Sequence, residues 1–143
     1  MERNIMRSAL RAGAVPIRDE IKARAPVDTG ALRDSVRITT RAKAGQVSAS
    51  VKVGNKTAWY AFLTEFGTRP HKILPKRVGG ALRFGGTEAR SVEHPGIAGH
   101  PFIRPGVDAA FTASVTAVQA KVRQRLTKQG IDVPDAVPSD PEE

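Results

Sequence analysis

The side chains that could do chemistry in this 143-residue chain are few and widely spaced. Its three histidines, His71, His94 and His100, follow one another at intervals of 23 and 6 positions in a glycine-rich stretch. A zinc site needs three or four ligands held in tetrahedral geometry, and the chain has no cysteine to complete such a set. We therefore interpret these histidines as solvated loop residues and expect no bound metal and no cofactor.

A general acid or a nucleophile is equally poorly supported. Glu65 is the one acidic residue in the aromatic stretch 57–68, and burial there would raise its pKa, as a general acid requires. A pairing with an arginine, or a cap on neighbouring backbone, is the commoner fate of such a carboxylate. Ser35, Ser91 and Ser114 lack the context of a nucleophile elbow. The glycine pairs of the chain lack the Gly-Lys-Ser/Thr ending of a phosphate loop. The sequence predicts a protein that is not an enzyme.

The charge of the chain is strongly basic and unevenly distributed. The net charge is +9, yet from Gly130 onward there are five acidic residues and no Lys or Arg. A basic body implies an anionic neighbour, which can be nucleic acid, an acidic protein face or an acidic tail. We expect residues 1–130 to form a single α+β domain and residues 131–143 to form an acidic, proline-rich flexible tail. No apolar run approaches the ~20 residues of a membrane span, and no signal sequence precedes the domain, so we expect synthesis in the cytoplasm.

Hydrophobic periodicity predicts two long helices and a hairpin. An apolar stripe at helical spacing runs through residues 3–25, with Pro16 expected to kink or split that helix, and Asp28 or Thr29 can cap a short helical turn after it. Alternating residues in 36–41 and 46–53 indicate an antiparallel hairpin that turns at 43–45. The last helix should begin near Pro105, place Asp108 in its first turn and end at Gly130. Its predicted apolar stripe is Val107, Phe111, Val115, Val118, Val122 and Leu126.

The stretch 57–68 contains four of the seven aromatic residues of the chain. Large rings bury much apolar area, so we expect a short core helix there, ended by Gly67. The residues assigned to core or turns are Gly30, Trp59, Tyr60, Phe62, Phe66, Gly67, Phe102 and Pro105.

A long basic excursion follows, from Thr68 to Pro101. Structureless loops of this length are uncommon, so we expect strands within it, with Ile73-Leu74 and Leu82 to Phe84 forming a hairpin that projects from the domain. The expected fold is α+β, with a small antiparallel sheet packed by an N-terminal and a long C-terminal helix and with this long hairpin-like loop. Six cations of the excursion are the predicted partner-binding residues: Arg69, Lys72, Lys76, Arg77, Arg83 and Arg90.

Several blocks of residues, taken in order, resemble the neck or tail-completion proteins of long-tailed bacteriophages and prophages, a family of tail components. The blocks are Ala25 to Ser35, Tyr60-Ala61 with Glu65 to Thr68, His94 to Gly96 and Pro101 to Pro105. The resemblance covers about residues 1–128 and does not extend to the acidic tail. It implies a structural role for these blocks, with Gly30 and Gly67 as turn formers and Tyr60 and Phe66 as core.

The resemblance also implies a function at the head–tail junction of a virion. A homomeric ring, six-fold or twelve-fold, would join the tail to the head-side connector and surround the DNA exit channel. Its neighbours would be head-completion or connector proteins and tail-terminator or tail-tube proteins, with non-specific contact to duplex DNA and no membrane. The alternative is a small basic nucleic-acid-binding module without sequence specificity, in which cations contact phosphates and Phe84 stacks on a base.

Overall fold

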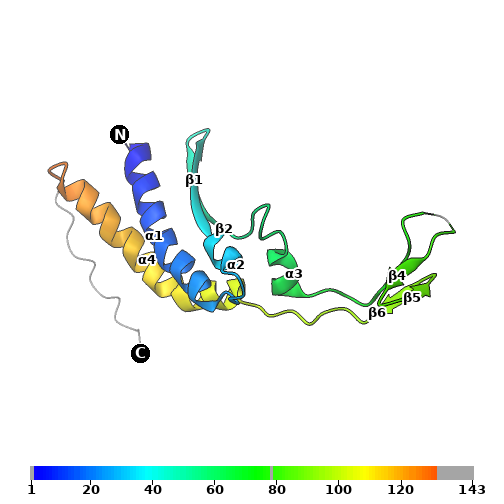
Figure 1. Cartoon of the computed structure of the whole chain (residues 1–143). Coiled ribbons are helices and arrows are strands. Elements are labelled where there is room, and N and C mark those ends of the chain that lie inside the picture. Colours follow the sequence, from blue (N-terminus) through cyan, green and yellow to red (C-terminus); the bar gives the residue numbers. More distant parts are fainter. Residues whose placement is uncertain (1, 78, 132–143) are drawn as a thin grey trace, which may run out of the picture.

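The computed structural model describes residues 2–77 and 79–131 and shows a helical body from which a thin arm extends (Figure 1). We call residues 68–101 the arm and the remaining described residues the body. The body contains α1 (Glu2–Arg24), α2 (Ala31–Asp34), β1 (Arg37–Lys43), β2 (Gln46–Lys52), α3 (Ala61–Phe66) and α4 (Ile103–Thr127). The arm contains β3 (His71–Ile73), β4 (Leu82–Phe84), β5 (Thr87–Ala89) and β6 (Val92–His94). The predicted α+β class is confirmed.

Helices α1 and α4 form the frame of the body and lie side by side (Figure 1). They approach closely because small residues occupy their contact. A Cβ on Gly106 of α4 would lie 2.9 Å from Cγ1 and 3.1 Å from Cα of Ile21, and a Cβ on Gly13 of α1 would collide with Cγ2 of Val118. Interiors are packed to crystal-like density, so such a contact tolerates no added methyl group without movement.

The two long helices differ from their predicted form in three respects. Helix α1 runs through Pro16 as one element, so the predicted split is wrong. Asp108 lies beyond the first turn of α4, which contains no acid. The buried residues of α4 are Gly106 and Ala110, whereas Phe111 is 62% and Val115 41% exposed. The apolar stripe predicted for α4 is therefore wrong at Phe111 and Val115, whereas Val107, Val118, Val122 and Leu126 are half-buried as the prediction requires.

The predicted hairpin is confirmed as β1–β2, but the predicted alternation of burial holds only for β2, because three consecutive residues of β1 are half-buried. The strands are antiparallel in a register that pairs Arg37 with Lys52 and Lys43 with Gln46, and the turn is Ala44-Gly45. Along β2, exposed and half-buried residues alternate without exception. The half-buried face packs towards α1.

The core lies where α1, α2, α3 and the start of α4 meet. Its buried residues include Ile21, Leu32, Val36 and Phe102, and Phe102 is 2% exposed, as predicted. Tyr60 is half-buried and packs against this cluster. The core prediction thus holds for Phe102 and in part for Tyr60.

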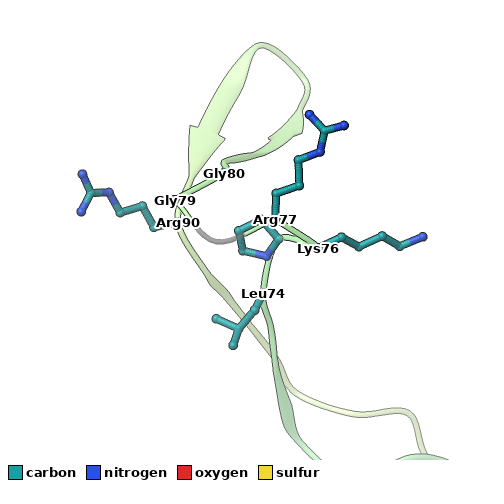
Figure 2. A pocket seen from close by; sticks show the side chains of 7 residues that line it. Leu74, Lys76, Arg77, Gly79, Gly80 and Arg90 are labelled. Atoms are coloured by element: carbon teal, nitrogen blue, oxygen red, sulfur yellow. The ribbon is translucent and has the colours of Figure 1, made fainter.

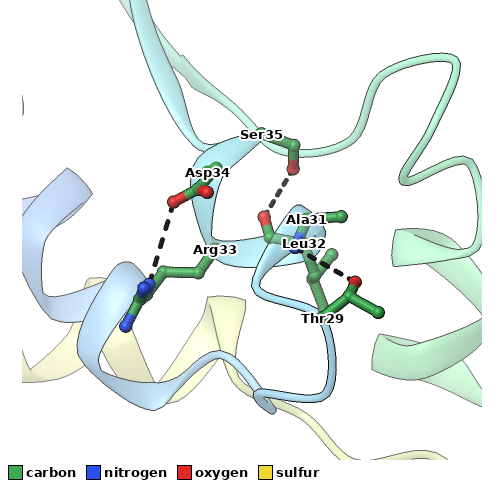
Figure 3. A network of polar contacts seen from close by, with 6 residues as sticks. All are labelled: Thr29, Ala31, Leu32, Arg33, Asp34 and Ser35. Atoms are coloured by element: carbon green, nitrogen blue, oxygen red, sulfur yellow. Dashed lines mark hydrogen bonds and ion pairs between the residues drawn. The ribbon is translucent and has the colours of Figure 1, made fainter.

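The short helix α2 joins α1 to the hairpin through a local polar network (Figure 3). It begins after Gly30, whose φ of 82° is left-handed and confirms its role as a turn former. Thr29 Oγ1 accepts a hydrogen bond from Ala31 N at 3.4 Å. At the other end, Ser35 Oγ donates to Leu32 O at 2.6 Å and accepts from Gly54 N at 2.9 Å. Ser35 is thus a buried structural residue.

The predicted flexible tail, residues 131–143, lies outside the described residues except for Ile131, which is exposed. No described helix combines the length and the apolar character that a membrane crossing would need.

Candidate functional site

The most unusual surface of the body is a stripe of exposed aromatic rings on α3 and the turn before it. Trp59, Phe62 and Phe66 are 70%, 67% and 69% exposed, and the rings of Phe62 and Phe66 lie 4.8 Å apart between centroids. The prediction that these three residues are core is therefore wrong. We call them the aromatic stripe. Monomeric proteins rarely expose contiguous apolar patches of several hundred Å², and larger ones mark interaction sites.

The error has a geometric cause. The residues that α3 and its preceding turn bury are Ala58, Ala61 and Glu65, which follow the same three-and-four spacing one position earlier. One residue corresponds to about 100° around a helix, so the period was predicted correctly and the face was not. The turn is held by Asn55, whose Oδ1 accepts hydrogen bonds from Thr57 N at 2.9 Å and Ala58 N at 2.7 Å.

Glu65 determines which face of α3 turns inward. Its Oε2 accepts hydrogen bonds from Phe102 N at 2.7 Å and Ile103 N at 2.9 Å, and its Oε1 accepts from Arg104 N at 3.2 Å. These N–H groups belong to the start of α4, where intrahelical partners are lacking and the helix dipole favours a negative charge. The carboxylate therefore caps α4 from a helix 37 residues away in the sequence.

The environment of Glu65 is that of a structural carboxylate. Burial would raise its pKa, but the hydrogen bonds from Ile103, Phe102 and Arg104 outweigh burial and lower the pKa below its usual value. The side chain therefore stays ionised at neutral pH and its oxygens are occupied by backbone donors. Of the roles open to this carboxylate, the backbone cap, which the sequence favours together with an arginine pairing over a general acid, is the one that the structure shows.

The arm leaves the body through a close crossing of two backbone segments, which we call the arm root. Thr68 and Ile97 pair through N–H to O bonds of 2.9 and 3.1 Å, and His100 N donates to Thr64 O at 2.7 Å. A Cβ on Gly67 would collide with the carbonyl oxygen of Ile97. Gly67 has a φ of 70°, so its predicted role as a helix-ending turn residue is confirmed. The root and the Glu65 cap together fix the direction in which the arm leaves.

Beyond the root, the arm is a narrow double ribbon. Strand β3 pairs with β6, and β4 pairs with β5 around the turn Gly85-Gly86. The predicted pairing of Ile73-Leu74 with the strand 82–84 is therefore wrong, although the strands themselves exist. Among the described residues, the substantial contacts of the arm strands are with each other and none is with a helix. The arm extends away from the body, as predicted (Figure 1).

Four of the six predicted partner-binding cations have no acidic partner among the described residues. The exceptions are Lys72, with Nζ 3.8 Å from Glu93 Oε1, and Arg83, with Nε 2.6 Å from Glu88 Oε1. The four unpaired cations are Arg69, Lys76, Arg77 and Arg90, all exposed.

Three of these cations border a shallow concavity of about 480 Å³ beside Leu74. Figure 2 shows the charged ends of Lys76, Arg77 and Arg90 pointing in different directions, so they do not converge on one anion. Exposed apolar residues lie among them, with Leu74 and Phe84 at least half exposed. The geometry suits a contact spread over an extended surface better than a small-molecule site.

A second apolar feature, which we call the apolar groove, lies between α1, β2 and α4. It has a volume of about 340 Å³ and is lined by uncharged residues, among them Leu10, Ile17, Val51, Val107 and Ser114. Phe111 lies on the same side of α4, because it is four residues after Val107 and three before Ser114. Phe111, which is 62% exposed, therefore adds an exposed apolar side chain at the edge of the groove.

Titratable groups do not gather into a reactive cluster within residues 2–77 and 79–131. No three His, Cys, Asp or Glu side chains there are placed to hold a metal ion. His71 and His94 face each other across β3–β6, with ring centroids 5.1 Å apart. The Nδ1 atom of His94 accepts a hydrogen bond from Gly96 N at 3.0 Å. His100 does not join this pair.

Three features are typical of a protein that works by contacting other macromolecules. They are the exposed aromatic stripe, the open apolar groove and a cationic arm that does not pack substantially against the body. Part of the chain also matches a known family. Residues 2–67 fit the family described as "Bacteriophage HK97-gp10, putative tail-component", which confirms the resemblance to phage tail components for that part of the chain. The match ends where the arm begins, so the blocks His94 to Gly96 and Pro101 to Pro105 lie outside it. No curated protein and no solved structure matches the chain.

Proposed function

We propose that this chain is a structural virion protein of the phage head–tail junction. It forms a homomeric ring that joins the tail to the head-side connector and surrounds the channel through which DNA leaves. The N-terminal match to phage tail components supports the class of protein. The observation that carries the proposal is the arm, which has exposed apolar and cationic side chains and no substantial packing against its own body.

The energetics of the arm support an assembly role. Isolated two-stranded ribbons are at best marginally stable in water, and each strand of the arm has only three residues. A ribbon of this kind gains a hydrophobic partner when it lies on another subunit or on an adjoining ring. The connector on the head side and the tail-terminator or tail-tube proteins on the other side are the partners that this position supplies.

Imaging of assembled particles tests the proposal. In particles made by the phage that encodes the chain, a tag fused to the N-terminus should label a closed ring between head and tail, with six or twelve copies. Particles from a strain lacking the chain should contain separate heads and tails, and the tagged chain should restore joining. Labelling at the distal end of the tail, or purified particles without the chain, would contradict the proposal.

A second function at the same position is contact with duplex DNA inside the channel. The four unpaired cations of the arm favour it, because each lysine or arginine that neutralises a phosphate releases counterions on binding. Binding of the purified chain to duplex DNA of random sequence should weaken steeply with salt, with a slope of about −0.9 per phosphate contact in log affinity against log salt. Changing Arg77 and Arg90 together to Gln should make that slope shallower by about two such contacts. A response that is flat in salt would rule out phosphate contacts.

A further inference from the structure

Helices α3 and α4 both expose large apolar side chains that the fold of this chain does not bury. Each buries small or capping residues and leaves large apolar residues next to them in solvent. On α3 the buried line is Ala58, Ala61 and Glu65 and the exposed line is the aromatic stripe. On α4, Gly106 and Ala110 are buried while Phe111 and Val115 are exposed. The second exposed line lies beside the apolar groove.

We propose that the aromatic stripe of one copy of this chain docks into the apolar groove of the next copy. The inference rests on the proposed homomeric ring and specifies the two surfaces that make it. The stripe projects outward and the groove is hollow, so the contact joins two different surfaces of the same chain. A contact of this heterologous kind produces a closed ring when its rotation closes, whereas a contact between two stripes would end at a dimer.

One chain cannot satisfy both surfaces by itself. Glu65 binds the backbone at the start of α4, and the arm root ties Thr64 to His100. These bonds hold α3 at the N-terminal end of α4, with Ala61 and Glu65 facing inward and the aromatic rings facing outward. The stripe is therefore presented at a fixed angle, and a groove on another molecule is the complement available from this chain.

Charge favours a second copy at these surfaces. The sequence up to residue 129 contains 23 basic and 9 acidic residues, so two copies repel each other over most of their area. The groove is lined by uncharged residues, and the one charged residue of α3, Glu65, is buried. The stripe and the groove are thus places where two copies can meet without opposing like charges.

The available area agrees with a partial interface that the arm completes. Aromatic side chains bury roughly 200 Å² each, so three rings about two-thirds exposed offer about 400 Å². A stable interface buries about 800 Å² on each partner. The stripe therefore supplies about half of that area, and the exposed apolar residues of the arm are in a position to supply the remainder.

The absence of cysteine makes cross-linking a direct test. In the full-length chain, Phe62→Cys places a thiol in the stripe and Ser114→Cys places one in the groove. A short bifunctional thiol reagent should convert this double variant into a ladder of covalent dimers, trimers and higher species, in concentrated solution and in purified particles. A matched control combines Phe62→Cys with Ser48→Cys, because Ser48 is exposed on the opposite face of β2 from the groove. The control should give no ladder.

The outcomes separate this inference from the ring proposal. Dimers formed by Phe62→Cys alone would show a contact between two stripes and would overturn the head-to-tail assignment. A ring in the particles without cross-links between positions 62 and 114 would overturn the stripe-to-groove contact and leave the ring intact. A chain that is monomeric in solution and absent from particles would overturn the ring proposal itself.

Complementation gives a second, independent measurement. A stripe variant, Phe62→Ser with Phe66→Ser, keeps its groove, and a groove variant, Ser114→Trp, keeps its stripe. Neither should assemble beyond the monomer on its own. Mixed in equal amounts they should form heterodimers and nothing larger, as measured by light scattering after size exclusion. Circular dichroism verifies that both variants are folded, and full assembly by a folded stripe variant would refute the proposal.

Discussion

In the body, α1 and α4 touch along lines of glycine and alanine, whereas in the arm each strand has three residues and pairs with a single neighbour. The body buries Phe102, Ile21 and the apolar residues packed around them, while Leu74 and Phe84 of the arm are at least half exposed. The stability of the chain therefore resides in the body. The arm adds little to stability and contributes contact surface, so mutations in the two regions should have different consequences.

Replacing the outer arm should have the largest effect, and it should be on assembly alone. Substituting residues 74–91 by Asn-Gly keeps the stem β3–β6 and closes it with a two-residue hairpin turn. Because the removed strands contact only each other substantially, the thermal midpoint of the body should stay within experimental error. Joining of heads to tails should be abolished. Normal joining by this variant would show that the arm is dispensable.

Overpacking the contact between the helices should produce the largest loss of stability. In Gly106→Val, the new side chain would meet the Cγ1 and Cα atoms of Ile21, and we expect the free energy of unfolding to fall by about 3 kcal/mol. Ala109→Val is the matched control, because Ala109 is exposed on the same helix and should cost less than about 1 kcal/mol. Urea denaturation measures both. Equal losses in the two variants would mean that the close contact with Ile21 does not limit packing.

Removing the charge of Glu65 should have the next largest effect, because Glu65 ties the arm root to the body. Glu65→Gln weakens three hydrogen bonds from backbone N–H groups to a carboxylate that is 5% exposed, and should lower the free energy of unfolding by about 2 kcal/mol at pH 7. Asp108→Asn, an exposed substitution on α4, should change it by less than about 0.5 kcal/mol. An unchanged midpoint in Glu65→Gln would contradict the cap.

The same cap predicts a direction for the dependence on pH. The folded pKa of Glu65 is lower than its usual value of 4.5, so the folded state binds this proton less tightly than the unfolded state does. Its contribution to stability is therefore complete above the unfolded pKa and is lost as the pH falls from about 4.5 through the folded pKa. The difference in stability between wild type and Glu65→Gln should shrink over that window. A constant difference down to acid pH would refute the assignment.

Sequence-based prediction succeeds for one element of the body and fails for another. The alternation of apolar and polar residues within 36–53 predicts the hairpin, because successive side chains of a half-buried strand point to opposite faces of the sheet. Size alone assigns the aromatic stripe to the core, because large hydrophobic side chains are usually buried. Neither Ala61 nor Gly106 has a large apolar side chain, and only three-dimensional packing shows that these residues are buried.

Two signals in the sequence could have corrected the assignment. Glu65 repeats the spacing of Ala58 and Ala61, and an acid on the same face as two alanines suggests a buried partner such as a helix start. Aromatic rings crowded on the adjacent face of so short a helix then point to contact with another chain. The sequence does not specify which strands of the arm pair with each other, because a strand of three residues has too little alternation to define a register.

The smallest effect should come from the closest ion pair of the arm. Arg83 Nε and Glu88 Oε1 lie 2.6 Å apart, but the two side chains are 80% and 57% exposed, and solvent screens such a pair. Arg83→Gln should therefore change the free energy of unfolding by less than about 0.5 kcal/mol. The same variant should still join heads to tails, since the paired cation is neutralised within its own hairpin, whereas loss of the unpaired Arg77 and Arg90 should weaken joining or DNA contact. A loss of stability in Arg83→Gln as large as that in Glu65→Gln would show that the arm and the body fold as one cooperative unit, and the contrast between the two regions would then fail.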